Sequence, residues 1–522
     1  MTYKEAQIKH TMQWTNAAIF CLFFVFFLHA IEDPDIWFHM TIGRAVLDTG
    51  AIPTHEFYVF TRMGDIAKFH EWGFGLIYQL VFKALGISGI IIFNALLGAL
   101  TVFILFIIAR NRGASIGIAL STVAVAYWLM EFRFVERPEN FLYFALAATL
   151  YFIDRFRQRD DWRYLCAIPV IGLLLSQIHP SVILLILVIG TYLVEAIAKK
   201  KPDFKKASIL GLAIVATSLL SLLNPYGLEQ LTLPVKFSLD GEFLQSFTEF
   251  LPAMSTEFAY RFVIAMGLGI FALSGIRKRC SVAEWIILIA FSYLAYKHVR
   301  DIPLLGIALV LPLATALEYH LQSIRLQSVL ALVLIGGFAI DSARFHNLGL
   351  EIDPTLAPIK GAETVAKYSQ SPNILNFYHL GNYLAWRLYG SHRVIIDGRN
   401  YSDNKSIQLH DALLSAAPGW RQLVWRYDID SVVTPATLPY SGNFVPLAFE
   451  LIHDPEWVLL SREPAGVVFI RRDRVPQNVT VLTERDLWLQ AKDELSNTLG
   501  AYPDSASSLK SMESVKAYLL QH

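Results

Sequence analysis

Long apolar runs are the feature that most limits how this 522-residue chain can fold. A membrane-spanning helix needs about 17 to 25 predominantly apolar residues, and the sequence contains about eleven runs near that length. We therefore predict an α-helical polytopic membrane protein with about eleven transmembrane helices. The runs are Trp14–Ile31, Ser88–Ala109, Ala114–Met130, Phe141–Ile153, Tyr164–Ile178, Val182–Ala198, Ala207–Leu223, Phe262–Ile276, Val282–Tyr296, Pro303–Leu317 and Gln327–Ile340.

The composition agrees with a membrane protein. Only 17% of the residues are charged, whereas soluble domains are about 25% charged. The formal net charge is zero, so the overall balance does not indicate a nucleic-acid partner, and we expect none. Cys21, Cys166 and Cys280 lie in or beside apolar runs and form no Cys-x-x-Cys pair. We therefore predict neither a structural disulfide nor a zinc site built on cysteines.

The distribution of basic residues predicts the orientation in the membrane. Short loops rich in Lys and Arg stay on the cytoplasmic side, and here basic residues gather in every second loop. We therefore expect a multi-pass protein of the bacterial inner membrane, with a cytoplasmic N-terminus and with everything after Ile340 outside. The basic clusters are Lys4 with Lys9, Arg110 with Arg112, Arg155–Arg163, Lys199–Lys206 and Arg277–Arg279.

The composition changes at Asp341, where short β-rich runs begin to alternate with helical stretches. This pattern predicts a small extracytoplasmic α/β domain. We expect a transmembrane catalytic domain over 1–341, the α/β domain over 342–475 and a C-terminal helical appendage over 476–522. The predicted strands lie near Asn373–Tyr378, Arg393–Asp397, Ser431–Thr434, Trp457–Leu460 and Gly466–Ile470, and the predicted helices near Ser406–Ala416 and Trp420–Tyr427.

The first outside loop begins with Asp33-Pro34-Asp35 and carries the leading catalytic candidates. A capping carboxylate followed by proline is typical of a helix start, and capping alone explains Asp33. Asp35 and His39 are four residues apart, so they share one face of the predicted helix. Placing an ionised carboxylate close to lipid costs free energy unless the group is paired, so such a residue is a candidate for a functional role. Asp35 is therefore the first candidate for a catalytic base, and Asp33 the second.

Other polar residues of the outside loops are candidates for lining the same site. His70 and Glu71 end the first loop, and with His39 and Arg133 they offer acid, base or acceptor contacts. Carboxylates beside imidazoles also leave a divalent cation possible, although no fixed ligand spacing identifies a metal site.

Cationic residues are scarce in the outside loops, which makes the few that occur there informative. Arginine binds phosphate through a bidentate fork, so we expect these residues to bind the phosphate of a lipid. The alternative is ion pairing with Glu131, Glu136 or Asp301 nearby. The candidates are Arg137, Arg300, Lys297 and His179.

Taken together, these residues resemble the GT-C superfamily of membrane glycosyltransferases, which includes protein O-mannosyltransferases and the lipid A aminoarabinose transferase. A group of bacterial glycosyltransferase-like membrane proteins with an Asp-x-Asp-x-Trp-x-His start is more similar still. The resemblance covers most of the chain up to about Arg472. It is carried by Asp33–His39 with Gly43, Thr49-Gly50 with Pro53, His70-Glu71-Trp72, Arg137-Pro138, Asn224-Pro225-Tyr226-Gly227, Arg300-Asp301-Ile302-Pro303 and Asp397-Gly398-Arg399.

The resemblance implies a GT-C fold, a polyprenyl-phosphate-linked sugar donor and a catalytic aspartate in the first outside loop, here Asp35 or Asp33. This loop departs from the mannosyltransferase pattern, which begins with Asp-Glu, and the acceptor stays open among protein, lipid and glycan. The expected activity is a hexosyl or pentosyl transfer to an acceptor hydroxyl with inversion. A carboxylate would take the hydroxyl proton while arginines stabilise the departing phosphate.

Two other classes of function remain as alternatives. Intramembrane charges also mark the substrate path of a transporter, but a transporter should carry them near the middle of the bilayer in repeated halves. A noncatalytic scaffold would use the helices only as an anchor for a partner-binding outer domain. It would not need so many spans, or so many ionisable groups in its outside loops.

Overall fold

The computed structural model describes residues 3–239, 248–274, 280–399 and 404–521, and it divides into two compact units. The first unit comprises Met1–Ile31, His70–Phe74 and Leu80–Glu351, and the second comprises Glu32–Phe69, Gly75–Gln79 and Ile352–His522.

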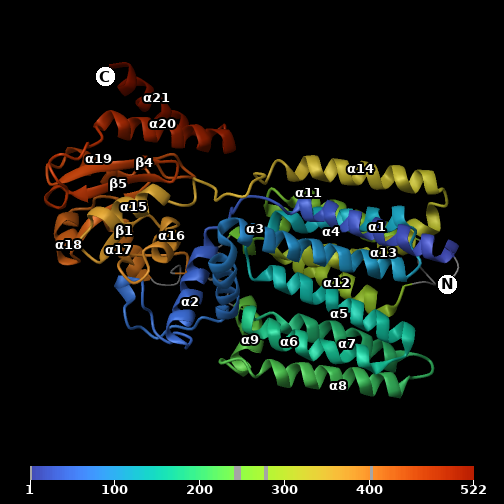
Figure 1. The fold of residues 1–522 in the computed structure, drawn as a ribbon. Coiled ribbons are helices and arrows are strands. Elements are labelled where there is room, and N and C mark those ends of the chain that lie inside the picture. The colour runs from blue at the N-terminus through green and yellow to red at the C-terminus, as the bar shows by residue number, and fades with distance from the viewer. Residues whose placement is uncertain (1–2, 240–247, 275–279, 400–403, 522) are drawn as a thin grey trace. The chain divides into compact units, whose positions relative to one another are not determined.

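The first unit is a bundle of helices, visible in Figure 1 as α1 and the helices from α3 to α14. Each of the predicted apolar runs lies largely within a helix of this unit. The long helices are α1 (Tyr3–Phe26), α3 (Trp72–Asn111), α4 (Ile116–Met130), α5 (Glu139–Arg159), α6 (Ala167–Ile178), α7 (Val182–Ala198), α8 (Phe204–Ser221), α9 (Leu228–Leu239), α11 (Ala259–Ser274), α12 (Val282–Lys297), α13 (Ile302–His320) and α14 (Ile324–Ser342).

Five helical segments in the described part of the chain are long and apolar enough to cross a membrane. They are Trp72–Asn111, Ile116–Arg133, Phe204–Ser221, Val299–His320 and Ile324–Ser342. Several shorter apolar helices, among them Val182–Ala198 and Ala259–Leu273, accompany them. The helical membrane architecture is therefore as predicted, while the number of eleven spans stays a prediction.

Helix α3 contains a break at Gly86, where φ is +69° and ψ is −160°. Only glycine adopts such backbone angles at little cost, because any Cβ would clash with the backbone. The break separates a first segment that starts at Trp72 from the apolar segment that ends at Asn111. Two helices of different direction therefore follow one another without a connecting loop.

The helices of the first unit pack around a continuous apolar core. Helix α13 packs against α4, α11 and α12, and α4 also packs against α14. Near the ends of α4, α11 and α14, the buried Arg261 donates a hydrogen bond to the Trp128 carbonyl at 2.7 Å. It also pairs with Glu131 at 2.6 Å and with Asp341 at 3.1 Å. Buried ion pairs of this kind fix which helix ends meet.

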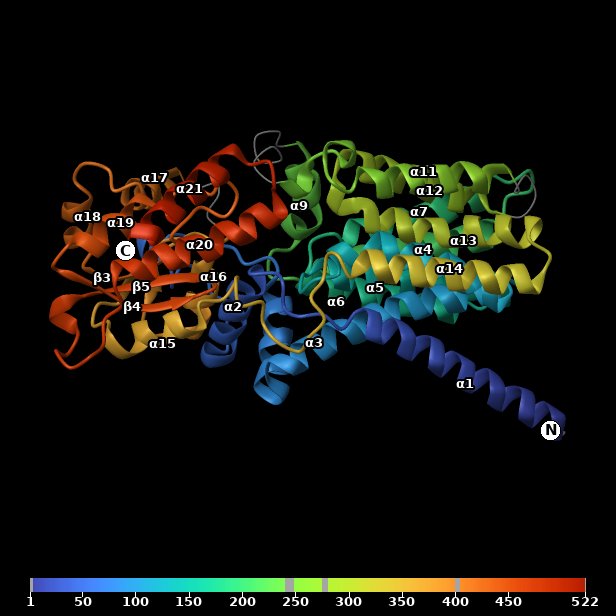
Figure 2. The ribbon, with the colours of Figure 1, turned by 90° about the horizontal axis from the view of Figure 1, so that it is seen from above.

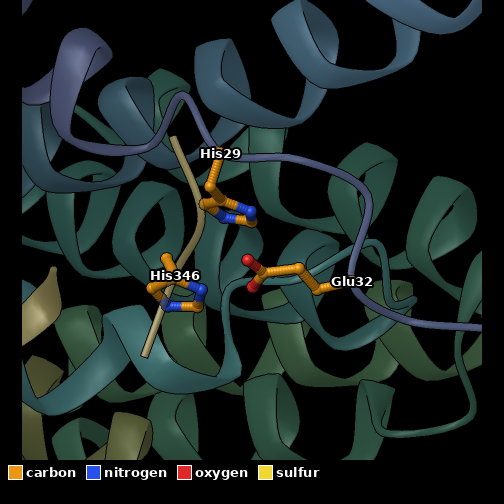
Figure 3. Close-up of side chains that lie close together, drawn as sticks. All are labelled: His29, Glu32 and His346. Carbon is orange, nitrogen blue, oxygen red and sulfur yellow. The ribbon is translucent and has the colours of Figure 1, made fainter. Parts of the chain in front are cut away.

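The Glu131 carboxylate has a second partner in the same unit. His346 lies 2.8 Å from it through Nε2, and the His346 ring stacks on that of His29 with a centroid distance of 4.4 Å. Figure 3 shows the two imidazoles lying one against the other. His29 in turn reaches the Phe134 carbonyl at 3.2 Å. The segment after α14 is therefore tied to the segment after α1 within the first unit.

The second unit is built on a five-stranded sheet with the order β2-β1-β3-β5-β4. The first three strands in that order are parallel, and β5 and β4 pair antiparallel. All predicted strands and both predicted helices are present. The strands are β1 (Asn373–Asn376), β2 (Arg393–Val394), β3 (Ile429–Thr434), β4 (Trp457–Glu463) and β5 (Gly466–Arg471), and the helices are α2 (Asp35–Thr49), α15 (Ile359–Tyr368), α16 (Leu380–Arg387), α17 (Asn404–Leu414), α18 (Trp420–Arg426), α19 (Pro446–His453), α20 (Glu484–Ala501) and α21 (Ala506–Gln521).

The last two helices contribute to the core of the second unit. Leu487, Leu495 and Val515 are fully buried in the cluster that also holds the sheet residues Val432 and Phe469. Helix α20 packs against β4 and β5, and Figure 2 shows α21 beside it. Burial of this apolar surface stabilises the unit by roughly 25 cal/mol per Å². The C-terminal helices are therefore part of the folded α/β unit.

Helix α2, which carries the first catalytic candidates, belongs to the second unit as well. It packs against α16. The buried Trp37 ring lies 5.1 Å from Tyr383 and 4.8 Å from Trp386, measured between ring centroids. Arg44 donates to the Trp386 carbonyl at 3.4 Å. Aromatic contacts and hydrogen bonds thus join two helices more than 300 residues apart in the sequence.

Candidate functional site

Three arginines of the first unit meet on two shared carboxylates, and we call this group the arginine cluster. The Glu249 carboxylate accepts hydrogen bonds from Arg300 at 2.8 Å, from Arg137 at 2.9 Å and from Arg133 at 3.0 Å. Glu139 accepts from Arg133 at 3.4 Å and also from Arg300. The structure therefore brings Arg137 and Arg300, two of the predicted phosphate-binding residues, together with Arg133, which was predicted to line the site. Phosphate binding by these residues stays a prediction.

Short helical turns at the ends of long helices hold this cluster in place. The turn η6 (Val299–Asp301) precedes α13, and η4 (Thr248–Phe250) carries Glu249. The two segments are joined by the Val299 N–H, which donates to Leu251 at 2.9 Å, and by the His298 ring nitrogen at 2.9 Å from the Phe250 carbonyl. These backbone and ring contacts therefore help to fix the position of Glu249 independently of its ion pairs with the arginines.

The electrostatics of the cluster favour an anion. Burial alone would raise the pKa of Glu249, but the guanidinium groups of Arg300, Arg133 and Arg137 lower it to about 2. Asp301 also interacts electrostatically with Arg300 and Arg133. Hydrogen bonds to ionised groups are the stronger ones, and arginine forks match phosphate oxygens. The cluster is therefore suited to a phosphate group.

His179, His70 and Glu71 occupy the neighbouring turns of the first unit. His179 follows α6, and its Nε2 lies 3.7 Å from Glu71 Oε1. The His70 ring nitrogen Nδ1 lies 2.9 Å from Gln230 Oε1. Burial lowers the pKa of His179 to about 4; Glu139 acts in the opposite direction, and Arg300 lowers it further. His179 is therefore uncharged at neutral pH and can offer a phosphate a hydrogen bond but no charge.

The lowered pKa of His179 predicts how the stability of the folded protein changes as the pH is lowered. On acidification the unfolded chain takes up the proton near pH 6.5, whereas the folded protein does so only near pH 4. Stability therefore falls as the pH is lowered through this interval. His179→Asn removes this effect, so we expect its melting temperature, relative to the parent, to rise steadily from pH 7 to pH 4. Thermal unfolding at a series of pH values measures it.

The exposed Gln322, which carries no titratable group, provides the control for this measurement. Gln322→Asn should give a difference from the parent that does not change between pH 7 and pH 4. A constant difference for His179→Asn as well would contradict the neutral buried imidazole.

Lys297 and Glu131 lie apart from the arginine cluster. Lys297 is exposed at the end of α12, and among the described residues no ion pair joins it to the arginine cluster. Glu139 and Glu249, which were not among the expected alternative partners, bind the arginines, and the expected Asp301 acts on Arg300 electrostatically. Glu131 pairs instead with Arg261 and His346.

The candidate aspartates lie in the second unit, at the start of α2. Asp33 accepts a hydrogen bond from the backbone N–H of Asp35 at 2.8 Å, so its carboxylate binds a backbone donor at the helix start as predicted, although Pro34 occupies the N-cap position. Asp35 is the first residue of the helix, and its Oδ1 lies 3.2 Å from Asn382 Nδ2 on α16. His39 follows one turn later on α2 and is buried. The catalytic roles of these residues remain predictions.

The motif Asp397-Gly398-Arg399 follows β2 in the same unit and forms a turn with a salt bridge. Asp397 accepts from the Arg399 backbone N–H at 3.0 Å and from its Nε at 2.8 Å. Glu56 and Tyr58 complete the group, since Arg399 donates to Glu56 at 3.0 Å and Tyr58 donates to Asp397 at 2.5 Å. Burial raises the pKa of Tyr58 well above its ordinary value, so the phenol keeps its proton and remains the donor.

Several residues that we did not single out from sequence take part in these arrangements, among them Glu139, Glu249, Asn382, Glu56 and Tyr58. Glu139 directly follows the Arg137-Pro138 pair, which was a usable signal. Glu249 lies in a predicted outside loop, but nothing local distinguishes it from the loop's other acidic residues. Asn382 and Tyr58 carry no motif at all.

Comparison with known proteins gives a family match and a common fold. Residues 68–221 match the family model described as dolichyl-phosphate-mannose-protein mannosyltransferase. That range includes Arg133, Arg137, Glu139 and His179, while Asp35 and Arg300 lie outside it. No curated protein sequence matches the chain significantly.

Three solved structures illustrate the shared fold. The oligosaccharyltransferase AglB from Archaeoglobus fulgidus, with an inhibitory peptide and a dolichol-phosphate, aligns with a TM-score of 0.58 at 11% identity over 93% of this chain and 78% of that one. The same enzyme with zinc and sulfate gives a TM-score of 0.54 at 12% identity, over 90% and 73%. ArnT from Cupriavidus metallidurans, bound to undecaprenyl phosphate, gives a TM-score of 0.58 at 13% identity, over 92% and 100%.

At such low identities the solved structures establish the fold, and the family match adds a sequence relation for part of the chain. Together with the arginine cluster and the aspartates at the start of α2, they confirm that the chain resembles the GT-C superfamily of membrane glycosyltransferases, as its motifs predicted.

Proposed function

We propose that this protein transfers a sugar from a polyprenyl-phosphate carrier to an acceptor hydroxyl at the outer face of the bacterial inner membrane. The observation that carries the proposal is the arginine cluster, in which Arg133, Arg137 and Arg300 share Glu139 and Glu249. The solved relatives with the same fold hold dolichol-phosphate in one case and undecaprenyl phosphate in another, which supports this class of carrier.

The proposed reaction is a single displacement at the anomeric carbon. The acceptor oxygen attacks this carbon, its proton passes to the Asp35 carboxylate, and the bond between the carbon and the phosphate oxygen breaks. The electron pair of that bond stays on the polyprenyl phosphate, whose negative charge the arginines stabilise. One displacement inverts the configuration at the anomeric carbon.

The second unit, with Asp397-Gly398-Arg399, shapes access for an acceptor that is a protein, a lipid or a glycan.

Binding of the carrier lipid tests the first half of the proposal. Protein reconstituted in nanodiscs should bind undecaprenyl phosphate at least about tenfold more tightly than undecaprenol, since a hydrogen bond to a charged group contributes about 1.5–3 kcal/mol. Undecaprenol is the matched control because it has the same chain and lacks only the phosphate. Equal affinity for the two lipids would contradict a phosphate site.

A turnover assay tests the second half of the proposal, the transfer of the sugar to an acceptor. A panel of undecaprenyl-phosphate sugars, radiolabelled in the sugar, is incubated with the nanodiscs and a membrane extract as the source of acceptor. We expect free undecaprenyl phosphate and labelled product from one donor of the panel, and the fraction that carries the label identifies the acceptor class. A parallel reaction with EDTA decides whether a divalent cation takes part. A transporter would bind the lipid and leave the glycosyl bond intact.

A further inference from the structure

We infer that Asn382 and Gly398 are positioning residues for the Asp35 carboxylate, so that the C-terminal α/β region helps to build the reaction centre. The inference rests on the proposed role of Asp35 as the base and deepens it. All three residues belong to the second unit, although Asp35 and Asn382 are 347 positions apart in the sequence.

The orientation of the Asn382 amide follows from its neighbours. The backbone N–H of Gly398 lies 2.7 Å from Asn382 Oδ1, and an N–H can only donate, so the amide oxygen must face Gly398. The amide NH₂ then faces the Pro34 carbonyl at 3.1 Å and Asp35 Oδ1 at 3.2 Å. Because Asn382 is 1% exposed, water does not compete for these bonds. Asn382 therefore presents a fixed donor to one oxygen of the proposed base.

The fixed donor has a consequence for catalysis. A general base must meet the acceptor hydroxyl at hydrogen-bond distance in the right direction. A carboxylate at the first position of a helix can rotate about its side-chain bonds unless a neighbour holds it. The Asn382 bond to Oδ1 therefore restricts the rotation of the Asp35 carboxylate and sets the direction in which it meets the acceptor hydroxyl.

Gly398 leaves the space that the carboxylate occupies. A Cβ at this position would lie 2.8 Å from Asp35 Oδ1 and 2.8 Å from Asn382 Nδ2, closer than ordinary contact allows. The Gly398 backbone does not adopt the positive φ that restricts a position to glycine. The backbone would therefore accept alanine, and the conflict is confined to the ends of two side chains. This makes Gly398 a position where a methyl group disturbs the proposed base with little effect on folding.

The test compares Asn382→Ala and Gly398→Ala with the parent in the turnover assay. Both variants should lose about 10- to 100-fold in kcat, the cost of a misplaced catalytic group, while KM for the donor lipid stays near the parental value. Melting temperature is measured alongside. Asn373→Ala removes a side-chain bond to the Tyr427 carbonyl in the same domain, and Gly500→Ala adds a methyl group where nothing lies within 4 Å. Both controls should keep the parental kcat.

A double-mutant cycle separates positioning from general structure. If Asn382 acts through Asp35, then Asn382→Ala should cause no further loss in an Asp35→Asn background. Additive losses, or parental kcat in both single variants while Asp35→Asn is inactive, would overturn the inference and leave the proposed function intact. Parental turnover of Asp35→Asn itself would remove the base and the inference together. Gly398→Ala keeps the test decisive if Asn382→Ala does not fold.

Discussion

Asp35→Asn should lose at least about 10²-fold and up to about 10⁴-fold in sugar transfer, the usual contribution of a general base. The substitution is nearly isosteric, and its amide oxygen can still accept the bond from Asn382 that Asp35 Oδ1 accepts at 3.2 Å. What it cannot do is take a proton. Binding of undecaprenyl phosphate should stay at the parental level, because the phosphate is assigned to the arginine cluster. Initial rates of label transfer and lipid binding measure the two effects separately.

Asp48→Asn is the matched control, since Asp48 lies on the same helix α2 and pairs only loosely with Arg44 at 3.9 Å. It should transfer sugar at the parental rate. Near-parental transfer by Asp35→Asn would remove Asp35 from the mechanism and make Asp33 the candidate. Asp33→Asn would then be the variant to assay.

Arg300→Gln is expected to reduce turnover by about 10²- to 10³-fold, the range seen when one group that stabilises a developing oxyanion is removed. Arg300 binds both carboxylates of the cluster, Glu139 and Glu249, so its loss also removes the charge that holds them. Glutamine keeps a hydrogen-bond donor but carries no charge. Binding of undecaprenyl phosphate should therefore weaken together with turnover, in contrast to Asp35→Asn.

Arg157→Gln is the control for removing a partly buried arginine from the bundle. Arg157 lies 2.9 Å from Glu195 and 3.6 Å from Glu284, and its side chain is exposed to a similar degree, 25% against 19% for Arg300. Its loss should lower the melting temperature and leave lipid binding unchanged. Parental affinity for undecaprenyl phosphate in Arg300→Gln would exclude the arginine cluster as the phosphate site.

The helices of the first unit were predictable from sequence because apolar runs have few structural solutions. Backbone groups in lipid must be paired within the segment, so a long apolar run forms a helix, as Ala114–Met130 does in α4. Short sequence motifs also predicted local structure. Asp33 before Pro34 indicated a helix start, and the helix α2 begins at Asp35.

Partners distant in sequence were not predictable in the same way. Glu249 lies 112 positions from Arg137, and its position depends on the backbone contact between Val299 and Leu251. Asn382 carries no motif, and its bond to Asp35 exists only because α16 packs on α2. Local sequence therefore indicated which groups carry chemistry, while tertiary packing decides which of them meet.

The glycine break in α3 determines how much of that helix the bilayer can hold. Its 40 residues would measure about 60 Å as one rod, about twice the thickness of the hydrocarbon layer. The break leaves a segment from Trp72 to Leu85 that is too short to cross, with Leu80 and Leu85 exposed as lipid-facing side chains would be. The segment beyond Gly86 spans about 37 Å. This second segment packs into the apolar core of the first unit, so neighbouring helices set its tilt, and the break confines the requirement to cross the bilayer to this segment alone.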